Sequence, residues 1–166
     1  MKKTHVSMSL CIAAAALAAS PARALEAGQA APDFSLQGAK GAISAADLKG
    51  KLTYVDFWAS WCGPCKQSFP WLNEMQAKYG AKGFQVVGIN LDKKREDAER
   101  FLAATPAAFT IGYDAQGDSA KRFEIKGMPS SVLVGPDGKV IATHSGFRED
   151  ERKELEERIA GALAAK

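Results

Sequence analysis

The sequence is poor in cysteine and histidine, and it has no excess of charge once its first 24 residues are set apart. It has 166 residues, with three cysteines, two histidines and a formal charge of +3. Residues 1–24 contain three basic residues and no acidic one, which leaves 19 basic against 19 acidic residues in the remainder. A neutral domain gives no reason to expect binding to nucleic acid or to an anionic membrane surface. We therefore expect no nucleic-acid partner.

The chain also lacks internal repeats, low-complexity segments and Pro/Ser-rich linkers after residue 24. One domain over residues 25–166 is therefore expected. The apolar run Leu10–Ala19 has about half of the roughly 20 residues that a membrane-spanning helix needs. It follows the basic start Lys2-Lys3 and precedes the small-residue triplet Ala22-Arg23-Ala24, which is the order of a secretory signal peptide.

We expect this signal peptide, residues 1–24, to be cleaved after Ala24 and the protein to act in the periplasm. An uncleaved membrane anchor is the alternative. Cys11 is expected to leave with the leader, because Met8-Ser9-Leu10 before it lacks the pattern that precedes a lipid-attachment cysteine.

The mature chain then has only two cysteines, Cys62 and Cys65, separated by two residues. A disulfide that closes so short a loop constrains the unfolded chain very little, so a structural role is not indicated. A zinc site needs four ligands, and the mature chain offers only His144 in addition. The pair therefore predicts thiol chemistry or, as a different class of function, a Cu(I) delivery module with two soft ligands.

Short strands and helices alternate along the mature chain. Strands are expected over Phe34–Leu36, Ala42–Ser44, Leu52–Trp58, Phe84–Asn90, Ser130–Val134 and Val140–His144, and helices over Cys62–Tyr79, Lys93–Ala104 and from Asp150 onward. The first two strands are expected to form a hairpin. This order predicts an α/β fold in which helices flank a mixed central sheet.

The segment Cys62-Gly63-Pro64-Cys65 lies between an expected strand and an expected helix. Two intervening residues allow the thiols to reach each other within one helical turn. Cys62 would lie at the helix N-terminus, where unpaired N–H groups and the helix dipole favour the thiolate that attacks disulfides. Cys65 would lie one turn further in, shielded, and would resolve the mixed disulfide.

Asp56 interrupts the apolar strand six residues before Cys62. A carboxyl group inside such a strand is desolvated, which raises its pKa and suits it to accept the proton of the Cys65 thiol. The alternative is that Asp56 faces solvent. His144, at a strand end, is expected at the surface and not in the chemistry.

The tripeptide Gly127-Met128-Pro129 directly precedes an expected strand. Proline at a strand start is often only a boundary, because it cannot donate to the sheet. Beside a Cys-x-x-Cys helix, a cis Met128–Pro129 bond would present the backbone of Met128 next to Cys62. A substrate segment could pair there as an added strand.

Taken together, the stretch from Val55 to Cys65 and the segment Gly127-Met128-Pro129-Ser130 resemble the thioredoxin superfamily. Ala31-Pro32-Asp33-Phe34-Ser35-Leu36 and the later Gly135-Pro136-Asp137-Gly138 narrow the resemblance to the exported TlpA/ResA-like thiol–disulfide reductases. It covers nearly the whole mature chain.

The resemblance implies a thioredoxin fold with an N-terminal β-hairpin and an active-site loop that includes Trp61, Gly63 and Pro64. It implies no cofactor other than a redox-active Cys62–Cys65 disulfide. The implied partners are disulfide-bearing exported proteins and a membrane thiol-transporting reductant, with a possible place in cytochrome c or metallocentre assembly. A monomer is expected.

The resemblance is incomplete at Ser68, where many relatives carry glutamate, so the acid–base role falls to Asp56. An oxidase or isomerase of the same chemistry remains the alternative to a reductase.

Overall fold

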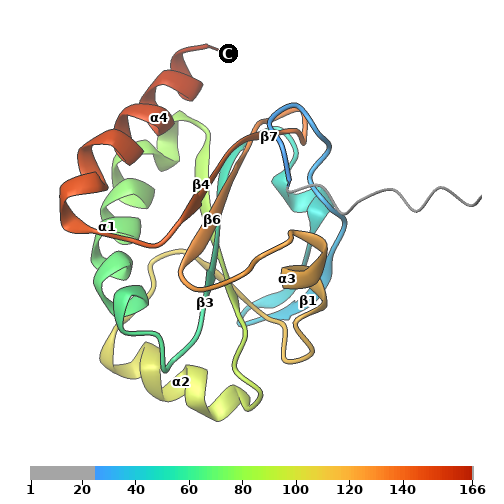
Figure 1. The fold of residues 1–166 in the computed structure, drawn as a ribbon, viewed down its shortest axis with the longest axis vertical. Coiled ribbons are helices and arrows are strands. Elements are labelled where there is room, and N and C mark those ends of the chain that lie inside the picture. Colours follow the sequence, from blue (N-terminus) through green and yellow to red (C-terminus); the bar gives the residue numbers. More distant parts are fainter. Residues whose placement is uncertain (1–24, 166) are drawn as a thin grey trace, which may run out of the picture.

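A seven-stranded mixed sheet forms the centre of the computed structural model, which describes residues 25–165 (Figure 1). Its strand order is β2-β1-β5-β4-β3-β6-β7. The strands are β1 Ser35–Gly38, β2 Gly41–Ser44, β3 Leu52–Trp58, β4 Phe84–Asn90, β5 Thr110–Tyr113, β6 Ser130–Val134 and β7 Val140–Ser145. The α-helices are α1 Gly63–Tyr79, α2 Arg95–Ala104, α3 Asp118–Arg122 and α4 Arg152–Ala164, with 3₁₀ turns η1 Ala45–Leu48, η2 Gly80–Lys82 and η3 Glu149–Glu151. The expected signal peptide lies outside the described residues.

The central strand β3 pairs with β4 in parallel and with β6 antiparallel. All seven of its residues are buried, which explains why it reads as an apolar run and not as an alternating pattern. Successive side chains still point to opposite sides of the sheet. Leu52, Tyr54 and Trp58 join one core cluster, while Val55 and Phe57 join the other.

Helices cover both sides of the sheet. Helices α1 and α4 lie on one side, which we call the α1 face, and α2 adds Ala98 to the same cluster (Figure 1). Helix α3 and η1 lie on the other side, which we call the α3 face, where Phe123 and Leu48 are buried. Within residues 25–165, no helix combines the length and the hydropathy required to cross a lipid bilayer.

The structure confirms the mixed α/β sheet and the N-terminal hairpin, and β3, β4 and β6 have the predicted bounds. Helix α2 begins at Arg95, two residues later than expected. Strand β5 and helix α3 were missed by the sequence analysis. Both are short, and β5 exists because it bridges β4 and β1, a pairing between distant segments that local sequence does not reveal.

Candidate active site

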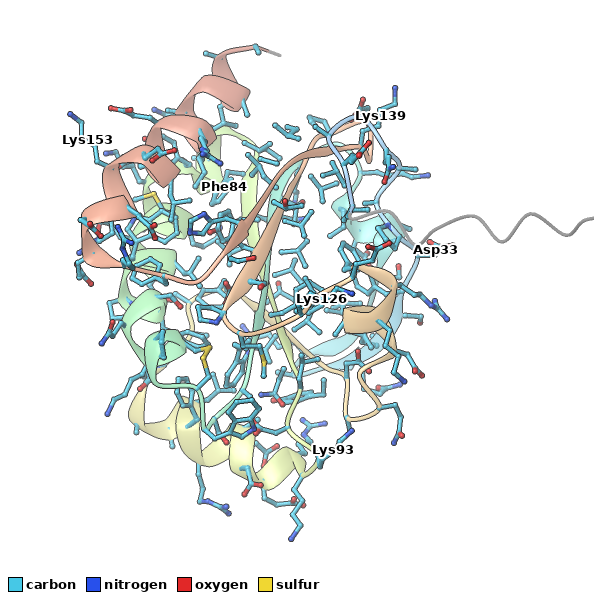
Figure 2. The ribbon with its side chains drawn as sticks, viewed as in Figure 1. Asp33, Phe84, Lys93, Lys126, Lys139 and Lys153 are labelled. Carbon is cyan, nitrogen blue, oxygen red and sulfur yellow. A yellow bond between two sulfur atoms is a disulfide. The ribbon has the colours of Figure 1, made fainter. Side chains whose placement is uncertain are left out.

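The two cysteines lie where the chain passes from β3 into helix α1. Cys62 is the N-cap residue of α1, and its Sγ accepts a hydrogen bond from the backbone N–H of Cys65 at 3.3 Å. The two sulfurs form a disulfide, seen as a yellow bond near the start of α1 in Figure 2. Pro64 occupies the first turn, where its missing N–H has no helical partner to lose. The prediction that Cys62 lies at a helix N-terminus is confirmed.

The two sulfur positions differ in access. Cys62 keeps 5% of its surface exposed, and Cys65 keeps none. Trp61, beside Cys62, is 73% exposed, and Gly63 and Pro64 are exposed as well. An external disulfide therefore meets Cys62 first, with an apolar ring beside it and Cys65 protected behind it.

A buried carboxylate holds the loop before Cys62 in place. Asp92 accepts hydrogen bonds from the backbone N–H of Ser60 at 2.9 Å, from the Ser60 hydroxyl at 2.9 Å and from the Asn90 amide at 2.8 Å. The N–H of Cys62 donates to the Ala59 carbonyl at 3.1 Å. The sequence analysis missed Asp92, because only the folded chain brings residue 92 to residue 60.

Asp56 lies on the α1 face, the side of the sheet against which Cys65 packs. The alternation along β3 places it there together with Tyr54 and Trp58. Only 3% of Asp56 is exposed, and its Oδ2 has no hydrogen-bond partner among residues 25–165. Burial raises the pKa of the Asp56 carboxyl well above its usual range. The alternative that Asp56 faces solvent is wrong.

Met128 and Pro129 lie at the same end of the sheet as the cysteines. The Met128–Pro129 peptide bond is cis, as expected. Ser130, the first residue of β6, pairs with Phe57, so Pro129 lies beyond the carboxyl end of β3. Pro129 is buried and Met128 is half-buried, and the Pro129 carbonyl accepts a hydrogen bond from the Gly146 N–H at 2.8 Å.

Trp58 is fully buried and packs its ring edge-on against Phe69 at 5.0 Å between centroids. His144 differs from expectation, because its side chain is only 20% exposed and its Nε2 is buried. Within the described part of the chain, no group of three or more His, Cys, Asp or Glu side chains is placed to hold a metal ion.

Comparisons with known proteins agree with this geometry. A family model described as Redoxin matches residues 26–159. The chain belongs to the Redoxin family. The thiol-disulfide oxidoreductase ResA of Bacillus thuringiensis subsp. konkukian is 33% identical over 136 residues, which cover 80% of this chain and 76% of that protein.

Two solved structures show the same family likeness. A Chlorobium tepidum protein described as a thiol:disulfide interchange protein DsbE superposes with a TM-score of 0.83 at 52% identity, covering 84% of this chain and 99% of that one. StoA from Bacillus subtilis superposes with a TM-score of 0.66 at 27% identity, covering 78% of this chain and 97% of that one.

Within the Redoxin family, the chain is a TlpA/ResA-like member of the thioredoxin superfamily, and it is a thiol–disulfide oxidoreductase. Its redox centre is the Cys62–Cys65 disulfide, and its substrates are disulfide-bearing proteins.

Proposed function

We propose that this oxidoreductase is exported to the periplasm and acts mainly as a reductant of protein disulfides there. The Cys62 thiolate attacks a substrate disulfide, which releases one substrate thiolate and forms a mixed disulfide. Asp56 takes the proton of the Cys65 thiol, and the resulting sulfur attacks Cys62 Sγ. The second substrate thiol leaves, and two electrons have passed from the protein to the substrate.

The observation that carries the reducing direction is which groups contact the Cys62 sulfur. In strongly oxidising relatives of this fold the reduced form is stabilised through the thiolate. Within residues 25–165, the Cys62 sulfur accepts a hydrogen bond from the N–H of Cys65, and no basic side chain donates one to it. The buried Asp56 would add repulsion whenever it is charged.

The Gly63-Pro64 dipeptide supports the same direction by analogy. Thioredoxin, with this dipeptide, has a potential of about −270 mV, against about −120 mV for a strong periplasmic oxidant. A substrate strand that pairs beside Met128 and Pro129 would bring its disulfide to Cys62.

Export is supported by the order of charged, apolar and small residues in residues 1–24. Electrons would come from a membrane thiol-transporting reductant, because an exported dithiol has no cytosolic reductant to recycle it. The protein would act as a monomer. A mature N-terminus at Leu25 in a periplasmic fraction would support export, and an intact N-terminus in the membrane fraction would contradict cleavage.

Redox equilibration against a reference dithiol tests the direction. A potential well below about −200 mV supports the reductase, and one near about −120 mV would instead indicate the oxidase or isomerase. Reduction of insulin disulfides by the reduced protein is the matching activity assay. The double variant Cys62→Ser/Cys65→Ser is the control for thiol-independent precipitation.

A further inference from the structure

A row of polar side chains crosses the sheet from Asp56 to its edge at β7. The strand registers place Asp56 opposite Ser131, and Ser131 opposite His144. Residues directly opposite each other in antiparallel strands point to the same face, with Cβ atoms about 4.5–5.5 Å apart. All three side chains therefore lie in line on the α1 face.

The other direction along the sheet is filled by the rings of Phe109 and Trp58 and by Ile111. In β4, the residue opposite Asp56 is Gly88, which has no side chain. A Cβ atom placed there would lie 3.0 Å from the Phe109 ring, 3.1 Å from Ile111 and 3.1 Å from Trp58 Nε1. Of these three nearest atoms only Trp58 Nε1 is polar. The residue directly opposite Asp56 that carries a polar side chain is Ser131, on the β6 side.

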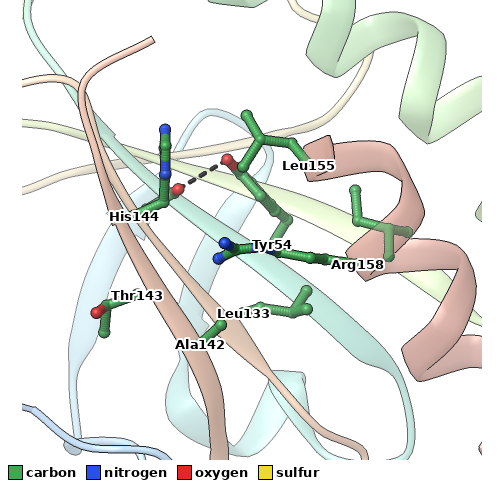
Figure 3. Close-up of a pocket in the computed structure, with 9 residues that line it drawn as sticks. Tyr54, Leu133, Ala142, Thr143, His144, Leu155 and Arg158 are labelled. Atoms are coloured by element: carbon green, nitrogen blue, oxygen red, sulfur yellow. Dashed lines mark hydrogen bonds between the residues drawn. The ribbon is translucent and has the colours of Figure 1, made fainter. Parts of the chain in front are cut away.

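Two hydroxyl groups stand on that side. The Ser131 hydroxyl donates a hydrogen bond to the Tyr54 hydroxyl at 2.7 Å, the dashed line in Figure 3. Tyr54 precedes Asp56 by two residues on the same face of β3. Burial first, and then the charge of Asp56, raises the pKa of the Tyr54 phenol.

A small cavity lies beyond these hydroxyls. Its volume is about 10 Å³, roughly the space of one water molecule. Tyr54 and Ser131 line its inner part, and His144 lines it from β7 (Figure 3). Leu155, Ile159 and Arg158 close it from α4.

His144 forms the outer end of the row. Its Nε2 lies 3.4 Å from a Glu151 carboxylate oxygen without forming a hydrogen bond, and part of the ring is exposed. The charged groups around the row are Glu151 from η3 and Arg158 from α4, with Arg148 beside Glu151 at 3.7 Å. Histidine is the side chain that ordinarily exchanges protons near neutral pH.

We propose that Ser131, Tyr54 and His144 form a proton route between Asp56 and solvent. The inference rests on the proposed acid–base role of Asp56. When Cys65 attacks Cys62 Sγ, its thiol proton passes to the Asp56 carboxylate. The hydroxyl pair and one water carry a proton onward to the His144 imidazole, which releases it to bulk water and leaves Asp56 as carboxylate for the next cycle. No electrons move along this route.

Single turnover with a chromogenic aromatic disulfide separates the steps. The first chromophore leaves when Cys62 attacks, and the second leaves when Cys65 resolves the mixed disulfide. His144→Ala should leave the first release unchanged and slow the second by roughly tenfold, less than the roughly 10² expected for loss of a general base. Free imidazole should restore the second release, because the deleted His144 ring lies at the solvent end of the proton route.

Tyr54→Phe should also slow the second release, but imidazole should not restore it, because the cavity admits only a water molecule. Thr143→Ala, in the lining of the same cavity but without a titratable group, should behave as wild type. Thermal unfolding of each variant checks that the fold is intact, and His144→Gln repeats the test with a polar side chain of similar length.

An unchanged second release in His144→Ala, or a slowing that imidazole does not relieve, would overturn the route. Rescue of Tyr54→Phe by imidazole would do the same. Asp56→Asn separates this failure from a failure of the proposed mechanism. If Asp56→Asn leaves the second release unchanged, the acid–base role of Asp56 is wrong; if it slows that release while His144→Ala does not, only the route is wrong.

Discussion

The two faces of the central sheet are both buried, but they differ in whether their buried polar atoms are paired. On the α3 face, apolar side chains such as Phe57, Phe123 and Val132 pack together. The polar Thr53 on that face has partners, since its hydroxyl donates to the Leu48 carbonyl and accepts from the Gln85 amide.

The α1 face holds the buried polar atoms that lack partners in residues 25–165: Asp56 Oδ2, Trp58 Nε1, Trp71 Nε1 and His144 Nε2. Each such atom costs free energy, because burial removes its water without replacing the hydrogen bond. The difference indicates that the α1 face gives up some stability to keep a buried carboxyl on the side of the sheet against which Cys65 packs.

The largest expected effect is on the α1 face. Cys65→Ser should abolish turnover, because no second thiol remains to resolve the mixed disulfide. Covalent complexes should then accumulate through Cys62, and mass spectrometry of proteins captured from an exported fraction would detect them. Absence of such complexes would contradict the assignment of Cys62 as the attacking thiol. The Cys62→Ser/Cys65→Ser variant is the control and should capture nothing.

On the α3 face, Phe57→Ala should affect stability and leave the chemistry alone. The Phe57 ring is fully buried and lies 5.3 Å from the Phe123 ring between centroids. The cavity left behind should lower the free energy of unfolding by about 3–5 kcal/mol, measured by urea denaturation of the oxidised protein. Phe57→Leu is the milder control. A large change in redox potential with either variant would show that the two faces are not separate.

On the α1 face, Asp56→Asn should raise the free energy of unfolding and lower turnover by roughly 10²-fold. Because the native pKa of Asp56 is raised, the native state binds a proton that the unfolded chain releases. The free energy of unfolding of the wild type should therefore fall as pH rises from about 4, the usual value for aspartate, up to the raised native pKa.

The Asn variant lacks this titration, so its unfolding should be less dependent on pH in that window. At neutral pH it should exceed the wild type by at least about 1 kcal/mol, since an unpaired buried carboxyl has been removed. Equal pH dependence of the two free energies of unfolding, measured in urea, would refute a raised pKa for Asp56.

The smallest expected effect on stability is that of Trp61→Ala, at the exposed rim of the α1 face. The free energy of unfolding should change by less than about 0.5 kcal/mol, because the ring is mostly in solvent. The KM for a protein disulfide should rise by roughly tenfold, equivalent to about 1.4 kcal/mol of lost contact. A small aromatic disulfide serves as the control substrate, and an equal loss for both would point to damage at Cys62 itself.

Much of this structure could be predicted from local sequence. The strands Leu52–Trp58, Phe84–Asn90 and Ser130–Val134 are mainly apolar runs with clear ends, because both of their faces are buried. Strand β5 was missed because Thr110–Tyr113 has only four residues, and pairing with β4 and β1 supplies its order. Helix α3, five residues long, was missed for the same reason.

The sequence alone determined that Cys62 and Cys65 form a pair at the start of a helix and that Asp56 lies in the strand before it. It also determined that Met128-Pro129 precedes a strand, because each of these features depends on neighbours along the chain. Only the tertiary structure decided which face Asp56 occupies, how Asp92 holds Ser60, and that Ser131 and His144 continue the row from Asp56. These depend on strand register, and a shift of one residue would turn every side chain of a strand to the other face.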